Sequence, residues 1–150
     1  MFSQSIGQVM RSDQLVTVAR STPVRQVAKL MAEHGVSAVI VVDGEAAVGI
    51  FTESDAVTRV MAADRDAVAT PVDQVMTPQP LVVNPRQVFG HALGLMHEHR
   101  FRHVPVVDNG RLVGIITARD ALDPELEDFV CEANRRENLS KSVEVGQVAT

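Results

Sequence analysis

Two stretches decide the fold of this chain: Val41-Val-Asp-Gly-Glu-Ala-Ala-Val-Gly-Ile-Phe-Thr-Glu-Ser-Asp55 and Val106-Val-Asp-Asn-Gly-Arg-Leu-Val-Gly-Ile-Ile-Thr-Ala-Arg-Asp120. They share an Asp, a Gly, a Thr and a final Asp at a constant separation of 65 positions, in the pairs Asp43/Asp108, Gly49/Gly114, Thr52/Thr117 and Asp55/Asp120. Such self-similarity indicates that one supersecondary unit has been duplicated. The sequence therefore predicts a fold built from two copies of one unit.

Each copy predicts the same order of elements: strand, helix, strand, strand, helix. Short apolar runs rich in β-branched residues are typical of buried strands, here 38–42, 47–51, 104–107 and 112–116, with briefer ones at 15–18 and 81–83. Tight turns separate the paired strands, at Asp43-Gly44 and Asp108-Asn109-Gly110. The predicted fold class is α+β, with two β-α-β-β-α repeats in residues 1–65 and 72–123 and a C-terminal helix and tail in 124–150.

Capping signals precede the first helix of each copy. Ser21-Thr22-Pro23 offers a hydroxyl cap with proline at the first helical position, and Asn84-Pro85 plays the same part in the second copy. Upstream of these helices the separation of the copies becomes 66, because a connection tolerates one added residue. Four methionines fall at positions typical of the core: Met31, Met61, Met76 and Met96.

The composition restricts the class of protein. The chain has 150 residues, of which 45% are hydrophobic, and with five Phe and no Trp or Tyr its core must be aliphatic. A formal net charge of −5 argues against binding to nucleic acid or to an anionic membrane. No apolar run has the length of a membrane span, no signal-peptide pattern is present, and the single Cys131 cannot form an internal disulfide. We expect a cytoplasmic protein.

The repeated Gly-x-x-Thr-x-x-Asp segments carry the chemistry of the sequence. A threonine at a helix start, with an acid three residues later, lies beside unpaired backbone N–H groups that attract phosphate. The carboxylate can accept the two vicinal hydroxyls of a ribose, and the preceding glycine lets a backbone or a ligand approach closely. The same spacing also forms a capping box that only stabilises the helix start. Spacing alone leaves both interpretations open.

The order of these motifs resembles a tandem pair of CBS motifs, the regulatory module named after cystathionine β-synthase. The resemblance covers roughly residues 6–122 and rests on Val75-Met-Thr-Pro78, on Arg102-His-Val-Pro-Val-Val-Asp108 and on both Gly-x-x-Thr-x-x-Asp segments. It implies that the two repeats pack through their sheets as one pseudo-two-fold module with two clefts. Such clefts commonly hold AMP, ADP, ATP or S-adenosylmethionine.

The resemblance also assigns roles to particular side chains. It implies nucleotide contacts for two Thr/Asp pairs and one basic pair: Thr52, Asp55, Thr117, Asp120, Arg102 and His103. At the positions that match the basic pair, the first copy has Ser37-Ala38. We therefore expect two clefts of unequal strength, at least one of them empty or taking an uncharged or monophosphate ligand.

Neither a catalytic nor a metal-binding pattern accompanies these motifs. His97 and His99 are two residues apart on a helix and point to different faces, so they cannot hold one ion together. We expect a protein that is not an enzyme, needs no cofactor and senses an adenosine-containing ligand as a homodimer or through an effector protein. We expect a helical extension with Leu126, Phe129 and Val130 on one side to contribute to the dimer contact. The alternative is a ligand-free structural or protein-interaction module in which Thr-x-x-Asp is only a cap.

Overall fold

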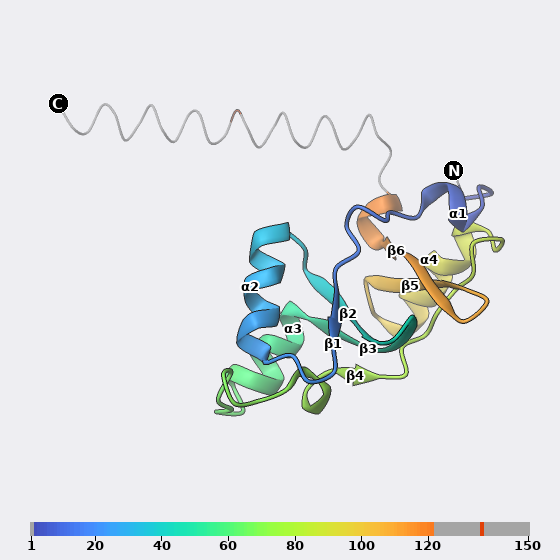
Figure 1. Cartoon of the computed structure of the whole chain (residues 1–150). Coiled ribbons are helices and arrows are strands. Elements are labelled where there is room, and N and C mark those ends of the chain that lie inside the picture. Colours follow the sequence, from blue (N-terminus) through green and yellow to red (C-terminus); the bar gives the residue numbers. More distant parts are fainter. Residues whose placement is uncertain (1, 122–135, 137–150) are drawn as a thin grey trace. The chain divides into compact units, whose positions relative to one another are not determined.

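A computed structural model describes residues 2–121 and residue 136. By its internal contacts the chain divides into a unit that ends at Ala118 and a second unit that begins at Arg119. The first unit holds the strands of both repeats (Figure 1). The expected C-terminal helix, with Leu126, Phe129, Val130 and Cys131, lies outside the described residues, so that part of the expectation stays a prediction.

The first repeat forms a four-stranded sheet in the order β1-β2-β3-β4. Its strands are β1 (Thr17–Ala19), β2 (Ala38–Asp43), β3 (Ala46–Thr52) and β4 (Thr77–Pro78). β1 runs parallel to β2, and the connection between them contains α2 (Val24–His34), whereas the other neighbours are antiparallel. Four consecutive buried residues at the start of β2 confirm that this strand is covered on both faces.

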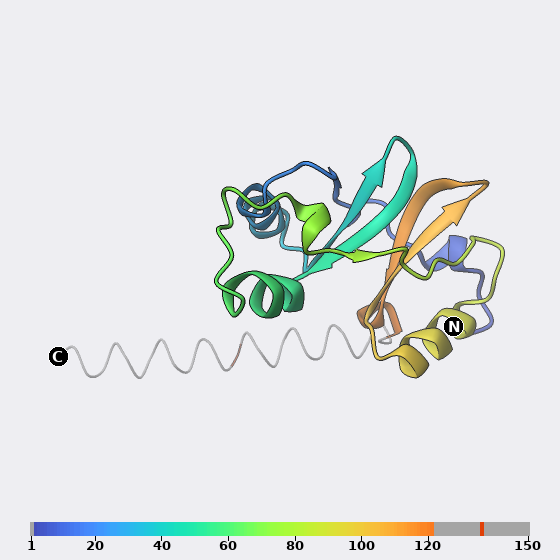
Figure 2. The ribbon, with the colours of Figure 1, turned by 90° about the horizontal axis from the view of Figure 1, so that it is seen from below.

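The second repeat reproduces this arrangement with shorter outer pairings. β5 (His103–Asp108) and β6 (Arg111–Thr117) form an antiparallel hairpin, preceded by α4 (Phe89–His99). Val83 pairs in parallel with Val106 at the place where β1 lies in the first sheet. The hairpins β2–β3 and β5–β6 lie side by side with β3 in contact with β6, and α2 and α4 lie on opposite outer sides (Figure 2). The predicted α+β fold with two equivalent repeats is confirmed.

The two repeats exchange the segments that lead into them. β4 belongs in sequence to the start of the second repeat, yet it pairs with β3 of the first. In return, Arg11 from the start of the first repeat pairs with Ile115 of β6. A short helical turn stands at the matching place in each leading segment, α1 (Ile6–Val9) and the 3-10 turn η2 (Val72–Gln74). Neither repeat therefore holds all of its strand pairings by itself.

The start of α2 differs from the predicted capping. Pro23 is the N-cap residue rather than the first helical residue, and its side chain makes no capping hydrogen bond. Instead, the N–H groups of Val24 and Arg25 donate to the carbonyl oxygens of Thr70 and Ala67 at 3.0 and 2.9 Å. The hydroxyl cap is not used, because the connection between the repeats supplies backbone acceptors for the first turn.

α4 begins later than the sequence indicates. Asn84 closes a turn, in which its Oδ1 accepts the N–H of Gln87 at 3.2 Å, and the helix starts only at Phe89. The N–H of Phe89 donates to the carbonyl oxygen of Gln4 at 2.8 Å. The leading segment of the first repeat thus supplies backbone acceptors for the first turn of α4, as the chain that precedes the second repeat does for α2.

The predicted helix starts after Thr52 and Thr117 are confirmed, but the helices that follow are irregular. Thr52 is the N-cap of α3 (Glu53–Asp55), which continues into the π-helix η1 (Ala56–Met61). Thr117 precedes the 3-10 turn η3 (Ala118–Ala121). The helical spacing assumed from the sequence therefore does not hold beyond Asp55, because a π-helix has a wider turn.

The core of the first unit is aliphatic, with Phe51 and Phe89 as its largest fully buried side chains. Met31, Met76 and Met96 are buried as predicted. The prediction for Met61 is wrong: its side chain is 73% exposed at the end of η1, where the π-helical turn has changed the face on which it lies.

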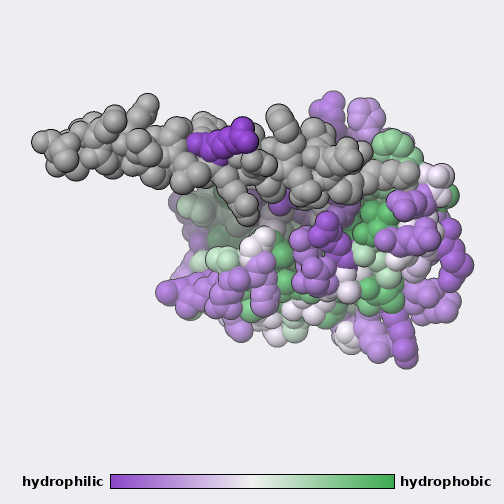
Figure 3. Space-filling model, turned by 90° about the horizontal axis from the view of Figure 1, so that it is seen from above, coloured by the Kyte–Doolittle hydropathy of each residue, from purple (hydrophilic) through white to green (hydrophobic). Residues whose placement is uncertain are grey.

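Large hydrophobic side chains are exposed at scattered positions of the described surface: Phe2, Val57, Met61, Val68, Leu81, Val82 and Val88. On the face drawn in Figure 3, hydrophilic residues surround smaller areas of hydrophobic ones. Among the described helices, none combines the length and the apolar character needed to cross a membrane.

Candidate ligand-binding cleft

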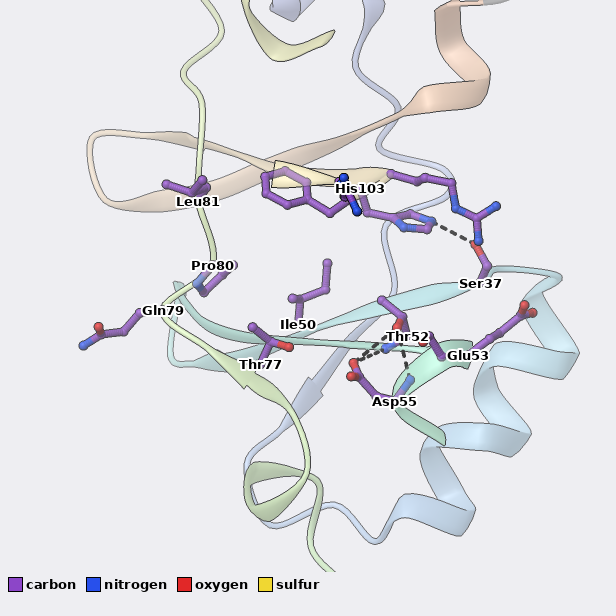
Figure 4. Close-up of a pocket in the computed structure, with 14 residues that line it drawn as sticks. Ser37, Ile50, Thr52, Glu53, Asp55, Thr77, Gln79, Pro80, Leu81 and His103 are labelled. Atoms are coloured by element: carbon purple, nitrogen blue, oxygen red, sulfur yellow. Dashed lines mark hydrogen bonds between the residues drawn. The ribbon is translucent and has the colours of Figure 1, made fainter. Parts of the chain in front are cut away.

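One cavity of the first unit is lined by both repeats. It has a volume of about 510 Å³, within the range of small-molecule sites. Its walls come from the start of β2, the end of β3 with α3, the segment around and after β4, and the junction of α4 with β5: Ser37, Ile50, Thr52, Glu53, Ser54, Asp55, Thr77, Gln79, Pro80, Leu81, Arg100, Phe101, Arg102 and His103. In Figure 4, Gln79, Pro80 and Leu81 lie across the cavity from Ser37 and Glu53.

Thr52 and Asp55 form a complete capping box at the floor of this cavity (Figure 4). The backbone N–H of Thr52 donates to Asp55 Oδ2 at 3.0 Å, and the Thr52 hydroxyl donates to the same oxygen at 3.2 Å. The N–H of Asp55 in turn donates to Thr52 Oγ1 at 3.4 Å. These bonds hold both side chains in one orientation at the start of α3.

The Asp55 carboxylate keeps part of its accepting capacity for a ligand. Oδ2 already accepts two hydrogen bonds, and Oδ1 lies 3.4 Å from Arg59 Nε. A carboxylate has about four acceptor positions, so protein groups use most of them and Oδ1 retains room for a further donor. The Thr52 hydroxyl can also turn its proton from Asp55 to a ligand oxygen. A vicinal diol therefore fits this pair only by sharing the capping bonds.

The expectation of free backbone N–H groups at this helix start is met only at Ser54, whose N–H has no partner among the hydrogen bonds of the described residues and which lines the cavity. The N–H of Glu53 donates to the carbonyl oxygen of Ser37 at 3.0 Å, and the N–H of Asp55 is held by Thr52. The second repeat shows the same arrangement, since the N–H of Ala118 donates to the carbonyl oxygen of Arg102 at 2.9 Å. An anion in the cavity would therefore find one free N–H group among the described residues of this turn, that of Ser54, and would otherwise be held by side chains.

Those side chains come from the other repeat. Arg102 and His103, which the sequence pattern singles out, line the cavity opposite the capping box, together with Arg100. His103 Nε2 and Ser37 Oγ share a hydrogen bond of 2.8 Å, which joins the two repeats beside the cavity. The serine at the position matching Arg102 is thus a partner of the basic pair, not merely its replacement.

Arg100 and the segment after β4 are lining residues that the sequence reasoning missed. Arg100 ends α4 in the left-handed conformation, with φ of 57°, at the position where α2 ends on Gly35. A non-glycine residue at this left-handed position is uncommon and was the available signal. Gln79, Pro80 and Leu81 had no such signal, because only the exchange of β4 brings them to the first repeat.

Thr117 and Asp120 are not among the residues that line this cavity. Thr117 lies opposite His103 in the β5–β6 ladder, and Asp120 is buried in η3. The structure therefore brings together Thr52, Asp55, Arg102 and His103 from the predicted set, and it places Thr117 and Asp120 at the matching helix start of the second repeat.

The glycine of each signature accommodates a methionine from the exchanged segment. A Cβ built on Gly49 would overlap the side chain of Met76, and one built on Gly114 would lie 2.9 Å from Met10 Sδ. Both positions are closer to the methionine side chain than a real Cβ could be. The close approach expected at these glycines is therefore made by a protein side chain.

Comparison with known proteins identifies the repeated unit. The family model of the CBS domain matches residues 6–62 and again residues 72–125. The chain is 36% identical over 107 residues to the CBS domain-containing protein YhcV of Bacillus subtilis (strain 168), covering 71% of this chain and 76% of that protein. It spans 20% to 25% of the length of plant CBS domain-containing proteins to which it is also similar.

Solved structures agree with this match. A protein with CBS domains from Burkholderia ambifaria MC40-6 superposes with a TM-score of 0.73 at 37% identity, covering 78% of this chain and 90% of that one. CBSX2, solved in complex with AMP, superposes with a TM-score of 0.68 at 30% identity, covering 78% of this chain and 92% of that one.

Proposed function

The chain belongs to the CBS-domain family and carries the domain twice in tandem, and from this premise we propose that it is a regulatory module that binds an adenine nucleotide. The nucleotide occupies the cavity between Thr52 and Asp55 on one side and Arg102 and His103 on the other. The observation that carries the proposal is that these four side chains, which come from different repeats, line one cavity of about 510 Å³.

Each wall of the cavity suits one part of a nucleotide. Asp55 Oδ1 accepts a hydrogen bond from the ribose diol, and the Thr52 hydroxyl can donate one to it. Arg100, Arg102 and His103 bind the phosphate, because guanidinium groups form paired, charge-assisted hydrogen bonds with it. Ile50, Leu81 and Phe101 offer apolar surface to the adenine ring.

The charges of the cavity favour a monophosphate. Two arginines and a histidine face two carboxylates, Glu53 and Asp55. This balance compensates the dianion of AMP better than the higher charge of ATP, and it disfavours the sulfonium cation of S-adenosylmethionine. The AMP complex of the related CBSX2 supports the same choice.

The second site, built on Thr117 and Asp120, is the weaker of the two in this proposal. Its matching basic positions are occupied by Ser37 and Ala38, which carry no charge. A nucleotide in the first cavity contacts both repeats and the segment after β4. Its binding changes how these parts are held together, and a cytoplasmic homodimer or an effector protein responds to that change. The protein has no catalytic step of its own.

Isothermal titration calorimetry with AMP, ADP, ATP and S-adenosylmethionine tests the proposal. We expect one dominant site with the order AMP before ATP, and no comparable site for S-adenosylmethionine. Asp55→Asn weakens AMP about tenfold or more, because the amide offers one acceptor oxygen instead of two. Arg102→Gln weakens AMP by a similar factor but leaves adenosine, which has no phosphate, unchanged.

The competing function is a ligand-free interaction module, favoured by the complete capping box at Thr52 and Asp55. It predicts that none of these ligands raises the melting temperature of the protein. Two equal sites for ATP would contradict the unequal clefts. Equal losses of AMP and adenosine affinity in Arg102→Gln would contradict the assignment of the phosphate to Arg102.

A further inference from the structure

Arg59 connects the floor of the cavity to the exchanged segment. Its Nε, in η1, lies 3.4 Å from Oδ1 of Asp55, which is four residues earlier at the end of α3. Its Nη1 donates to the carbonyl oxygens of Met76 at 3.0 Å and Val75 at 3.4 Å. One guanidinium group therefore holds a carboxylate of the first repeat and the backbone of the segment that leads into the second.

The two sides of this bridge both belong to the wall of the cavity. Asp55 is fixed at Oδ2 by Thr52 and at Oδ1 by Arg59, so both of its oxygens are held from opposite sides. Directly after Met76 the chain forms β4 and then reaches Gln79, Pro80 and Leu81, which form the facing wall. The position of that wall relative to the carboxylate thus depends on the Arg59 contacts.

Only the first repeat has this arginine. The residue that matches Arg59 in the second copy, at the separation of 65, is Pro124, which has neither a charge nor a side-chain donor. The asymmetry follows that of the basic pair, since both features favour the same cavity.

We propose that Arg59 is a positioning residue of this cavity, which orients the Asp55 carboxylate for a vicinal diol and holds the facing wall in register with it. The inference rests on the proposed function, because it assumes that a nucleotide occupies the cavity. Arg59 does not itself touch the nucleotide. Its contribution to affinity passes through the sugar and not through the phosphate.

The test measures the ratio of the dissociation constants of 2′,3′-dideoxy-AMP and AMP, which isolates recognition of the diol. For the wild-type protein we expect a ratio of about ten, and for Arg59→Gln a ratio close to one, because the carboxylate is no longer held at Oδ1. Arg59→Lys keeps the positive charge but cannot make the forked contacts, so its ratio also falls. A general loss of stability would weaken both ligands equally and leave the ratio unchanged.

Arg65→Gln is the matched control. Arg65 Nη1 donates to Gln74 Oε1 at 3.3 Å, in the same leading segment, but without a contact to Asp55 in the hydrogen bonds and ion pairs of the described residues. It should keep the wild-type ratio. A wild-type ratio in both Arg59→Gln and Arg59→Lys overturns the inference while leaving the proposed function in place. Failure of the wild-type protein to bind AMP overturns both.

Discussion

At the scale of single residues, the carboxylate of Asp55 caps α3 and also lines the cavity in which we propose that a nucleotide binds. Its Oδ2 stabilises the start of α3 through the backbone and the hydroxyl of Thr52, and its Oδ1 faces Arg59. A cap and a ligand contact are therefore not exclusive alternatives here. Because a ribose diol would share the hydrogen-bonding groups of the cap, we expect a substitution of Asp55 to change both the stability of the protein and the proposed nucleotide affinity.

The glycine of the signature gives a prediction at the same scale. Gly49→Ala places a Cβ against the buried side chain of Met76, and we expect a loss of about 1–3 kcal/mol in the free energy of unfolding. The measurement is urea denaturation. Gly94→Ala is the control: no atom lies within 4 Å of its built Cβ, so in the middle of α4 it should raise stability by about 0.5–1 kcal/mol. Equal effects of the two variants would show that Met76 moves aside without cost.

At the scale of elements, each first helix depends on backbone acceptors from the exchanged segment. The N–H groups of Phe89 and Gly90 donate to the carbonyl oxygens of Gln4 and Phe2 at 2.8 and 3.0 Å. In α2, the first N–H groups donate in the same way to carbonyl oxygens of the connection between the repeats. An exchange of this kind makes the stability of each repeat depend on the chain that precedes the other.

Removing residues 2–5 should therefore act on α4 more than on α2. We expect a loss of about 2 kcal/mol or more, from two missing hydrogen bonds and the contacts of the segment. In native-state hydrogen exchange, the amides of Phe89 and Gly90 lose protection, whereas those of Val24 and Arg25, which bind carbonyls of the connection, serve as internal controls. Uniform loss of protection in both helices would contradict the local role of the segment.

At the scale of the whole molecule, the expected homodimer needs a surface, and η1 presents one. Val57 and Met61 are 56% and 73% exposed on this π-helix, four positions apart. Single exposed hydrophobic side chains are common on monomers, so the contact of this pair with a second copy is a proposal that the oligomeric state must test.

We therefore expect a dimer in size-exclusion chromatography with light scattering at micromolar concentration. The double substitution Val57→Glu with Met61→Glu should shift it to the monomer, because four charges would face one another across the contact. Val88→Glu, at a residue that is 49% exposed at the start of α4, is the control and should leave the dimer intact. A wild-type monomer would remove the homodimer from the proposal.

The sequence alone determined the duplication, the order of elements and the two helix starts. These features follow from local rules: continuous apolar runs for β2, β3, β5 and β6, turn residues between the paired strands, and Thr-x-x-Asp at each helix start. The family resemblance added the basic pair Arg102 and His103, whose place in a cavity no spacing rule predicts. The same local rules failed at Met61, where a π-helix replaced the assumed periodicity.

Only the tertiary structure decided which side chains of the two repeats line the same cavity. It joined Thr52 and Asp55 of one repeat to Arg102 and His103 of the other, and it brought Leu81 and Arg59 into the same neighbourhood through the exchanged strand. The physical reason is that strand exchange and sheet packing depend on contacts between residues far apart in sequence. Several strands could make such contacts, and the free energy of the whole fold selects among them. Local sequence preferences do not predict which of these long-range contacts form, so the residues that line the cavity could be identified only from the fold.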